Sequence, residues 1–160
     1  MNKVIERFPK EVLAIIEGSF DWQKAIKITG NLLIKNQAIE VAYIDLMIQA
    51  VKQLGPYMVI IPHVAIVHAA PIKHVLKNKL VFLVFKEPVF FNCENDPVHI
   101  LIGLCALDSN SHLKHFQMIA DIFENEDSYQ KFMACKDDNE LYQLLNSNPR
   151  KEGNAHGWTF

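Results

Sequence analysis

Two apolar runs in the second half of the chain constrain the fold most. The segments "KLVFLVF" and "VHILIGLCAL" carry apolar residues at successive positions rather than at alternate ones. Successive side chains of a strand point to opposite faces of a sheet, so strands of this composition must be covered on both faces. The two runs therefore predict a sheet enclosed between layers of helices.

Helical signals surround these strands. Asp21 is a good N-cap for a helix that follows it, and apolar spacing predicts a second helix over about 40–54, ended by Gly55 and Pro56. After the last strand, "DSNSH" is a dense N-cap signal for a helix over about 109–123. Two shorter helices are predicted around 128–134 and from Asp137, which forms a capping-box-like pair with Glu140.

The order of these segments predicts the architecture. A strand over "EVLAII" precedes two helices, and a block of strands over "YMVII", "VAIVH", "KLVFLVF", "PVFF" and "VHILIGLCAL" precedes three more helices. Because no helix separates the strands of the block, some neighbouring strands must be antiparallel. We expect a three-layer α/β fold with a mixed, roughly five-stranded sheet and helices on both faces.

Length and composition bound the domain organisation and location. The 160 residues suit a single domain over residues 1–146, and the polar, breaker-rich end predicts a mobile tail over 147–160. The N-terminus lacks the pattern of a signal peptide, and no apolar run is long enough to span a bilayer. Three widely spaced cysteines without a C-x-x-C pair indicate a reducing compartment, so we expect a cytoplasmic protein.

The charge pattern argues against a nucleic-acid partner. The chain has 16 basic and 18 acidic residues, and its only arginines are Arg7 and Arg150. Nucleic-acid surfaces normally show clustered lysine and arginine.

The stretch "MVIIPHVAIVHAAPIKH" places three histidines beside or within apolar segments. His68 ends an alternating run and is followed by Ala69 and Ala70, which leave the imidazole uncrowded. A histidine in this position can act as nucleophile, general base or ligand, or it can be a hydrogen-bonded structural residue. The local pattern leaves these alternatives open.

Other motifs restrict the chemistry. His112 lies at the start of a predicted helix, where backbone amides and the helix dipole favour an anionic group. The chain lacks G-x-S-x-G, P-loop and G-x-G-x-x-G motifs. A metal site formed by histidines is an alternative without a supporting motif, and we expect neither a metal nor another cofactor.

Several segments in order along the chain resemble the enzyme IIA components of the bacterial sugar phosphotransferase system (PTS). They are "DWQKAI" (21–26), "GPYMVIIPHVAIVHAAP" (55–71), "FKEPVFFNCENDPVHILIGLCALDSNSH" (85–112) and "IADIFENEDSYQKFMACKDDNELYQLL" (119–145). The resemblance is to the mannitol/fructose-type fold and, within it, to the ascorbate-type branch.

The resemblance implies a phosphocarrier. His68 matches the histidine that accepts a phosphoryl group from phospho-HPr and passes it to a cysteine of a IIB component, which serves the membrane IIC permease. His112 matches the second histidine of the site, and we expect Ser111 and His112 to offer backbone amides to the phosphoryl oxygens. Ascorbate or a related sugar is the substrate implied by the branch.

Three positions depart from the ascorbate-type pattern. Val67 replaces a proline, Ala70 replaces an arginine, and His63 replaces a glycine. Loss of the arginine removes a fixed positive charge, for which Lys73, His74 or His63 are the candidate replacements. The departures keep open the alternative of a regulatory interaction module with the same fold.

Overall fold

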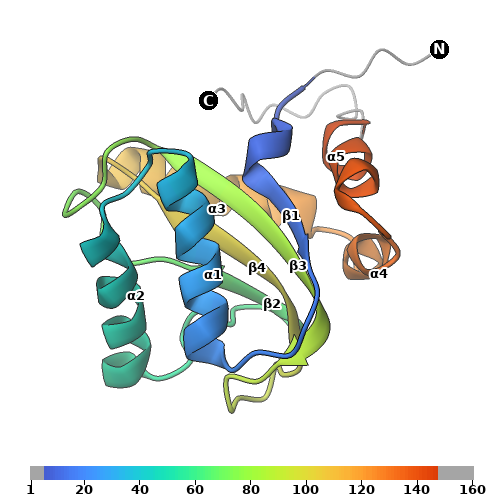
Figure 1. Cartoon of the computed structure of the whole chain (residues 1–160), viewed down its shortest axis with the longest axis horizontal. Coiled ribbons are helices and arrows are strands. Elements are labelled where there is room, and N and C mark those ends of the chain that lie inside the picture. Colours follow the sequence, from blue (N-terminus) through green and yellow to red (C-terminus); the bar gives the residue numbers. More distant parts are fainter. Residues whose placement is uncertain (1–5, 148–160) are drawn as a thin grey trace.

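A computed structural model describes residues 6–147, in which one mixed sheet is packed among helices (Figure 1). The strands are β1 (Leu13–Ile16), β2 (Val64–Val67), β3 (Lys79–Val89) and β4 (Val98–Cys105). The helices are a short 3-10 turn η1 (Lys10–Val12), α1 (Trp22–Lys35), α2 (Val41–Leu54), α3 (Ser109–Ile122), α4 (Ser128–Met133) and α5 (Asp138–Ser147). The part of the predicted tail beyond Ser147 lies outside the described residues.

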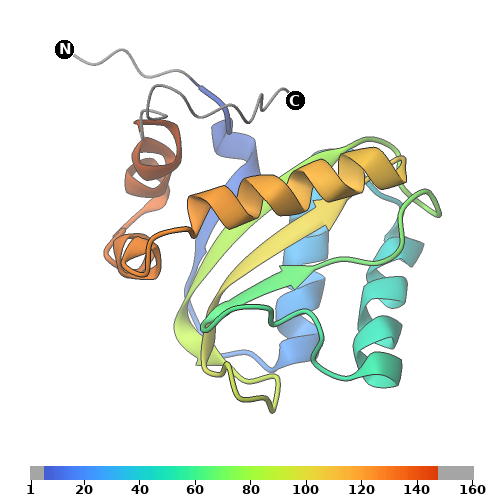
Figure 2. The same cartoon turned by 180° about the vertical axis from the view of Figure 1, so that it is seen from behind.

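The sheet has the order β1-β3-β4-β2. β1 is parallel to β3 and β2 is parallel to β4, whereas the central pair β3 and β4 is antiparallel. The expectation of a mixed sheet is therefore confirmed. Helices α1 and α2 lie on one face and α3 on the other, while α5 lies beside β1 (Figures 1 and 2).

The expected number of strands was wrong, because the sheet has four. The segment "YMVII" forms tight turns instead, with local bonds from Val59 N to Pro56 O and from Ile60 N to Met58 O. The segment "PVFF" is not a separate strand, since Pro88 and Val89 complete β3 after a register shift. Local turn hydrogen bonds and an uninterrupted long strand account for the difference.

The local signals act as the sequence predicts. Three aspartates cap helices by accepting a hydrogen bond from the backbone N–H three residues further on. The pairs are Asp21 with Lys24, Asp108 with Ser111 and Asp137 with Glu140. Each bond satisfies an amide that has no partner within its helix. Gly55 ends α2 with a φ of 80°, which is accessible to glycine without strain.

The two central strands are buried on both faces, as their composition predicts. Val81 to Phe85 of β3 and Ile100 to Cys105 of β4 have no exposed side chain. Gly103 lets α1 approach β4, because a Cβ there would lie 2.7 Å from Val81 Cγ2 and 2.8 Å from Thr29 Cγ2. Within residues 6–147, every helix is too short or too polar to cross a bilayer.

Candidate functional site

His68 directly follows β2, at the carboxyl end of this edge strand. Its Nδ1 lies 2.7 Å from the backbone carbonyl oxygen of Ile66. A carbonyl oxygen only accepts hydrogen bonds, so Nδ1 of the neutral ring carries the proton. The lone pair that can attack an electrophile is therefore on Nε2.

Three aromatic rings surround the His68 imidazole. The ring centroid of His112, in the first turns of α3, lies 5.5 Å away with an interplanar angle of 65°. The centroids of Tyr57 and Phe116 lie 5.3 Å and 5.1 Å away, both in edge-to-face geometry. The structure thus brings together His68 and His112, which are far apart in sequence, because β2 ends at the same end of the sheet where α3 begins (Figure 2).

Burial sets the charge state of the two imidazoles. It lowers the pKa of His68, an effect that the Ile66 carbonyl opposes and the nearby His112 reinforces. Burial also lowers the pKa of His112. Both rings are therefore mainly neutral at neutral pH, and His68 is available as a nucleophile. Nδ1 of His112 is buried and has no hydrogen-bond partner among the described residues.

Two contacts fix the backbone on either side of His68. The Ile66 N–H donates to the Met58 carbonyl at 2.9 Å, so the residue that orients the imidazole is itself held. On the other side, the buried Tyr43 hydroxyl accepts from Ala69 N–H at 3.0 Å and lies 3.0 Å from Leu104 O. Tyr43 thereby ties α2 to the turn after β2 and to the end of β4.

The expected amide donors at the start of α3 are already engaged. Ser111 N–H donates to a carboxylate oxygen of Asp108, and His112 N–H donates to the Asp108 carbonyl. The Ser111 hydroxyl lies 3.2 Å from Asn78 Nδ2, which donates to it. The N-cap and the helix use both amides in this structure, so their binding of phosphoryl oxygens stays a prediction.

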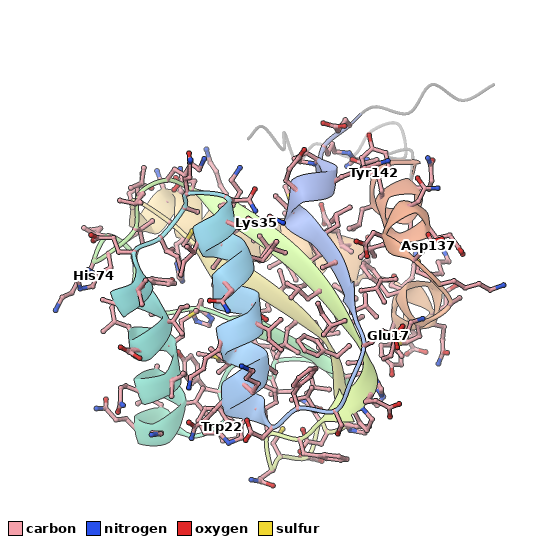
Figure 3. All side chains as sticks on the ribbon, viewed as in Figure 1. Glu17, Trp22, Lys35, His74, Asp137 and Tyr142 are labelled. Carbon is pink, nitrogen blue, oxygen red and sulfur yellow. The ribbon has the colours of Figure 1, made fainter. Side chains whose placement is uncertain are left out.

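None of the other candidate residues contacts the pair in the structure. His63 and His68 flank β2 at its opposite ends, and the His63 ring stacks on Tyr129 with Nδ1 2.8 Å from Pro97 O. His74 lies at the periphery, where Nδ1 is 3.1 Å from a carboxylate oxygen of Glu40 (Figure 3). Lys73 is exposed on the loop that follows His68. The structure therefore does not bring His63 to the candidate site.

Among residues 6–147, neither a metal-binding cluster nor an arginine lies beside His68. No three His, Cys, Asp or Glu side chains among residues 6–147 gather closely enough to hold a metal ion. The single arginine in this range is Arg7, whose backbone N–H donates to Asn146 of α5. Because α5 lies beside β1, this arginine is at the sheet edge opposite to β2.

Sequence reasoning missed the roles of Tyr43, Tyr57 and Phe116. Tyr43 follows the apolar start of α2, and a buried tyrosine needs a partner for its hydroxyl, which was an available signal. Phe116 falls on the apolar face of the predicted helix, and that position alone gives it no role at the site. No local pattern indicates that Tyr57 lies against His68, since this contact depends on how the turn after α2 meets β2.

Comparison with known proteins identifies the family. A model of the family described as "Phosphoenolpyruvate-dependent sugar phosphotransferase system, EIIA 2" matches residues 7–148. The ascorbate-specific PTS system EIIA component of Escherichia coli (strain K12) is 36% identical over 126 residues, covering 78% of this chain and 82% of the relative.

Solved structures agree with this relationship. The mannitol-specific cryptic phosphotransferase enzyme IIA from Escherichia coli has a TM-score of 0.78 and 27% identity, with 86% of this chain and 94% of that chain covered. A complex of enzyme IIAMTL and phosphorylated enzyme IIBMTL from Escherichia coli has a TM-score of 0.75. At 22% identity, with 87% and 96% of the chains covered, this second likeness shows the fold. The chain belongs to the EIIA 2 family of the phosphoenolpyruvate-dependent sugar phosphotransferase system.

Proposed function

We propose that this protein is a phosphocarrier in which His68 accepts a phosphoryl group from phospho-HPr and delivers it to a cysteine of a IIB component. The observation that carries the proposal is the bond from His68 Nδ1 to the Ile66 carbonyl, which leaves the Nε2 lone pair free beside His112. The burial that lowers the pKa of His68 keeps the nucleophile unprotonated.

The two transfer steps exchange one bond each. In the first, Nε2 of His68 forms a bond to the phosphorus of phosphohistidine on HPr, while the donor N–P bond breaks and its electron pair returns to the donor ring. In the second, the thiolate of the IIB cysteine forms an S–P bond while the N–P bond on His68 breaks. Nδ1 keeps its proton throughout, because the Ile66 carbonyl holds it.

His112 has the geometry for an auxiliary role. Phosphoryl transfer spreads negative charge over the equatorial oxygens, so a protein assists it mainly by positioning and by electrostatic stabilisation. An anion on His68 raises the proton affinity of the neighbouring imidazole, and a protonated His112 then donates to a phosphoryl oxygen. Neither step requires a metal or another cofactor.

The similarity to ascorbate-specific relatives supports ascorbate or a related sugar as the transported substrate. A IIB component as the acceptor is supported by the complex of enzyme IIAMTL with phosphorylated enzyme IIBMTL, since that IIA protein shares the fold of this chain. The IIA protein itself handles only the phosphoryl group, so the permease selects the sugar.

The main test is phosphorylation of the purified full-length chain with phosphoenolpyruvate, enzyme I and HPr. We expect an acid-labile adduct that is lost in His68→Ala and retained in His63→Ala, whose ring lies at the other end of β2. An adduct that survives His68→Ala, or no adduct with active donors, would contradict the proposal.

One observation favours a second candidate, a regulatory module that signals through binding. Arg7, the only arginine within the described range, lies at the opposite edge of the sheet from His68. A site that receives no guanidinium from residues 6–147 is expected to transfer more slowly. Phosphorylation without onward transfer to IIB, together with phosphorylation-dependent binding to another protein, would favour this candidate.

A further inference from the structure

A phosphoryl group on His68 needs hydrogen-bond donors that the residues discussed so far supply only in part. His112 lies on one side of the imidazole. The amides of Ser111 and His112 are engaged by Asp108, and Arg7 is remote. A further donor beside His68 would stabilise the phosphoryl oxygens.

Tyr57 lies directly against the imidazole. Its ring centroid is 5.3 Å from that of His68, at an interplanar angle of 79°. Its hydroxyl lies 3.4 Å from the His68 carbonyl oxygen, well beyond the usual O–H···O distance of about 2.7–2.8 Å. With 37% of its surface exposed, Tyr57 stands at the rim of the site, and its hydroxyl makes only a long hydrogen bond.

The backbone that carries Tyr57 is tied to the strand that carries His68. Tyr57 N–H donates to Gly55 O at 2.8 Å, and the adjoining Met58 carbonyl accepts from Ile66 N–H at 2.9 Å. Ile66 also orients His68 through its carbonyl. Rotation of the Tyr57 side chain can therefore redirect its hydroxyl while the main chain stays in place.

The phenol is suited to donate to an anion. Burial raises the pKa of Tyr57 above its ordinary value of 10.0, so the hydroxyl keeps its proton at neutral pH. Hydrogen bonds from a neutral donor to a charged acceptor are stronger than those to a carbonyl.

We propose that Tyr57 is a phosphoryl-binding residue whose hydroxyl moves from the His68 carbonyl to a phosphoryl oxygen when His68 is phosphorylated. Only hydrogen bonds are exchanged, and water replaces the hydroxyl at the carbonyl. The inference rests on the proposed function, since it requires the phosphoryl group to be on His68.

The test compares the wild-type chain with Tyr57→Phe, which keeps the ring contact and removes the hydroxyl. Tyr129→Phe is the matched control, because Tyr129 stacks on His63 away from His68. Each protein is equilibrated with phospho-HPr, and phosphorus NMR records the fraction phosphorylated and the resonance of the adduct. We expect the equilibrium constant for phosphorylation to be roughly tenfold lower in Tyr57→Phe than in wild type, as for loss of a hydrogen bond to a charged group. The phosphorus resonance of the adduct should also differ between the two proteins.

Two results of this comparison would overturn the inference, and they can be distinguished. An adduct with equal equilibrium and resonance in wild type and Tyr57→Phe overturns the role of Tyr57 alone. No adduct on the wild type overturns the proposed function and this inference with it.

If Tyr57→Phe does not fold, carbon NMR of the wild-type protein labelled at tyrosine Cζ tests the same inference. The Tyr57 resonance should move on phosphorylation while that of Tyr129 stays, and an unmoved Tyr57 resonance contradicts the proposal.

Discussion

Burial keeps three histidines at and beside the candidate site largely neutral at neutral pH. His68 and His112 both have lowered pKa values, and the more deeply buried His115 has its pKa lowered to about 4 by burial and by the proximity of His112. For His68 the effect supplies a neutral nucleophile. For His115 it lowers stability in acid, because the unfolded chain binds a proton there that the folded chain does not bind.

Stability should therefore fall as pH decreases from the ordinary histidine pKa of 6.5 toward about 4. In this window the unfolded state binds more protons, so the free energy of unfolding rises with pH, by up to about 1.4 kcal/mol per pH unit for one group. When the free energy of unfolding is measured with urea at several pH values and plotted against pH, its slope should be shallower in His115→Gln than in wild type. Equal slopes would show that His115 is protonated in the folded protein.

Tyr43 illustrates how elements are joined at the site. This residue of α2 is fully buried, and its hydroxyl meets the backbone of Ala69 after β2 and of Leu104 in β4. One side chain thus connects three elements next to His68. Burial raises the pKa of the phenol far above its usual range, so it stays a neutral hydrogen-bonding group.

Tyr43→Phe should destabilise the fold by about 1–3 kcal/mol, because it leaves the buried Ala69 N–H without its acceptor. Tyr142→Phe provides the control. The Tyr142 hydroxyl donates to Glu6 at 2.6 Å near the surface, where water can replace the lost bond, and its effect should stay within about 0.5 kcal/mol. Equal losses in chemical denaturation would contradict the role assigned to Tyr43.

The two ends of the described chain are joined through Asn146. Its side-chain oxygen accepts from Arg7 N–H and Phe8 N–H, and its amide donates to Phe8 O and Tyr142 O. Asp138 of α5 also accepts from Ile15 N–H of β1. Together these contacts hold α5 beside the edge strand and close the fold at that side.

Asn146→Ala should lower the free energy of unfolding by about 2–3 kcal/mol, since buried backbone groups of Phe8 lose their partners. Asn36→Ala is the comparison, because Asn36 makes two similar bonds, to Glu11 O and Leu32 O, in a more exposed position. A loss no greater than that of Asn36→Ala, measured by thermal and urea unfolding, would show that the Asn146 bonds contribute little to holding α5.

Helix starts and doubly buried strands are readable from the sequence because their causes are local. The caps at Asp21, Asp108 and Asp137 act on amides three residues away, and unbroken apolar runs require cover on both faces. The sequence also points to the pair His68 and His112, but through the resemblance to a known family rather than through any local rule.

Tertiary structure alone decided which groups meet. His63 is five positions from His68, yet an extended strand separates them. From distant segments, Phe116 contacts His68 and Tyr43 contacts its neighbour Ala69. The number of strands depended on whether apolar residues paired across the sheet or formed local turns. Whether the backbone amides at the start of α3 have partners depended on the Asp108 cap. Such outcomes follow from competition between distant hydrogen-bonding partners, which periodicity along the chain does not record.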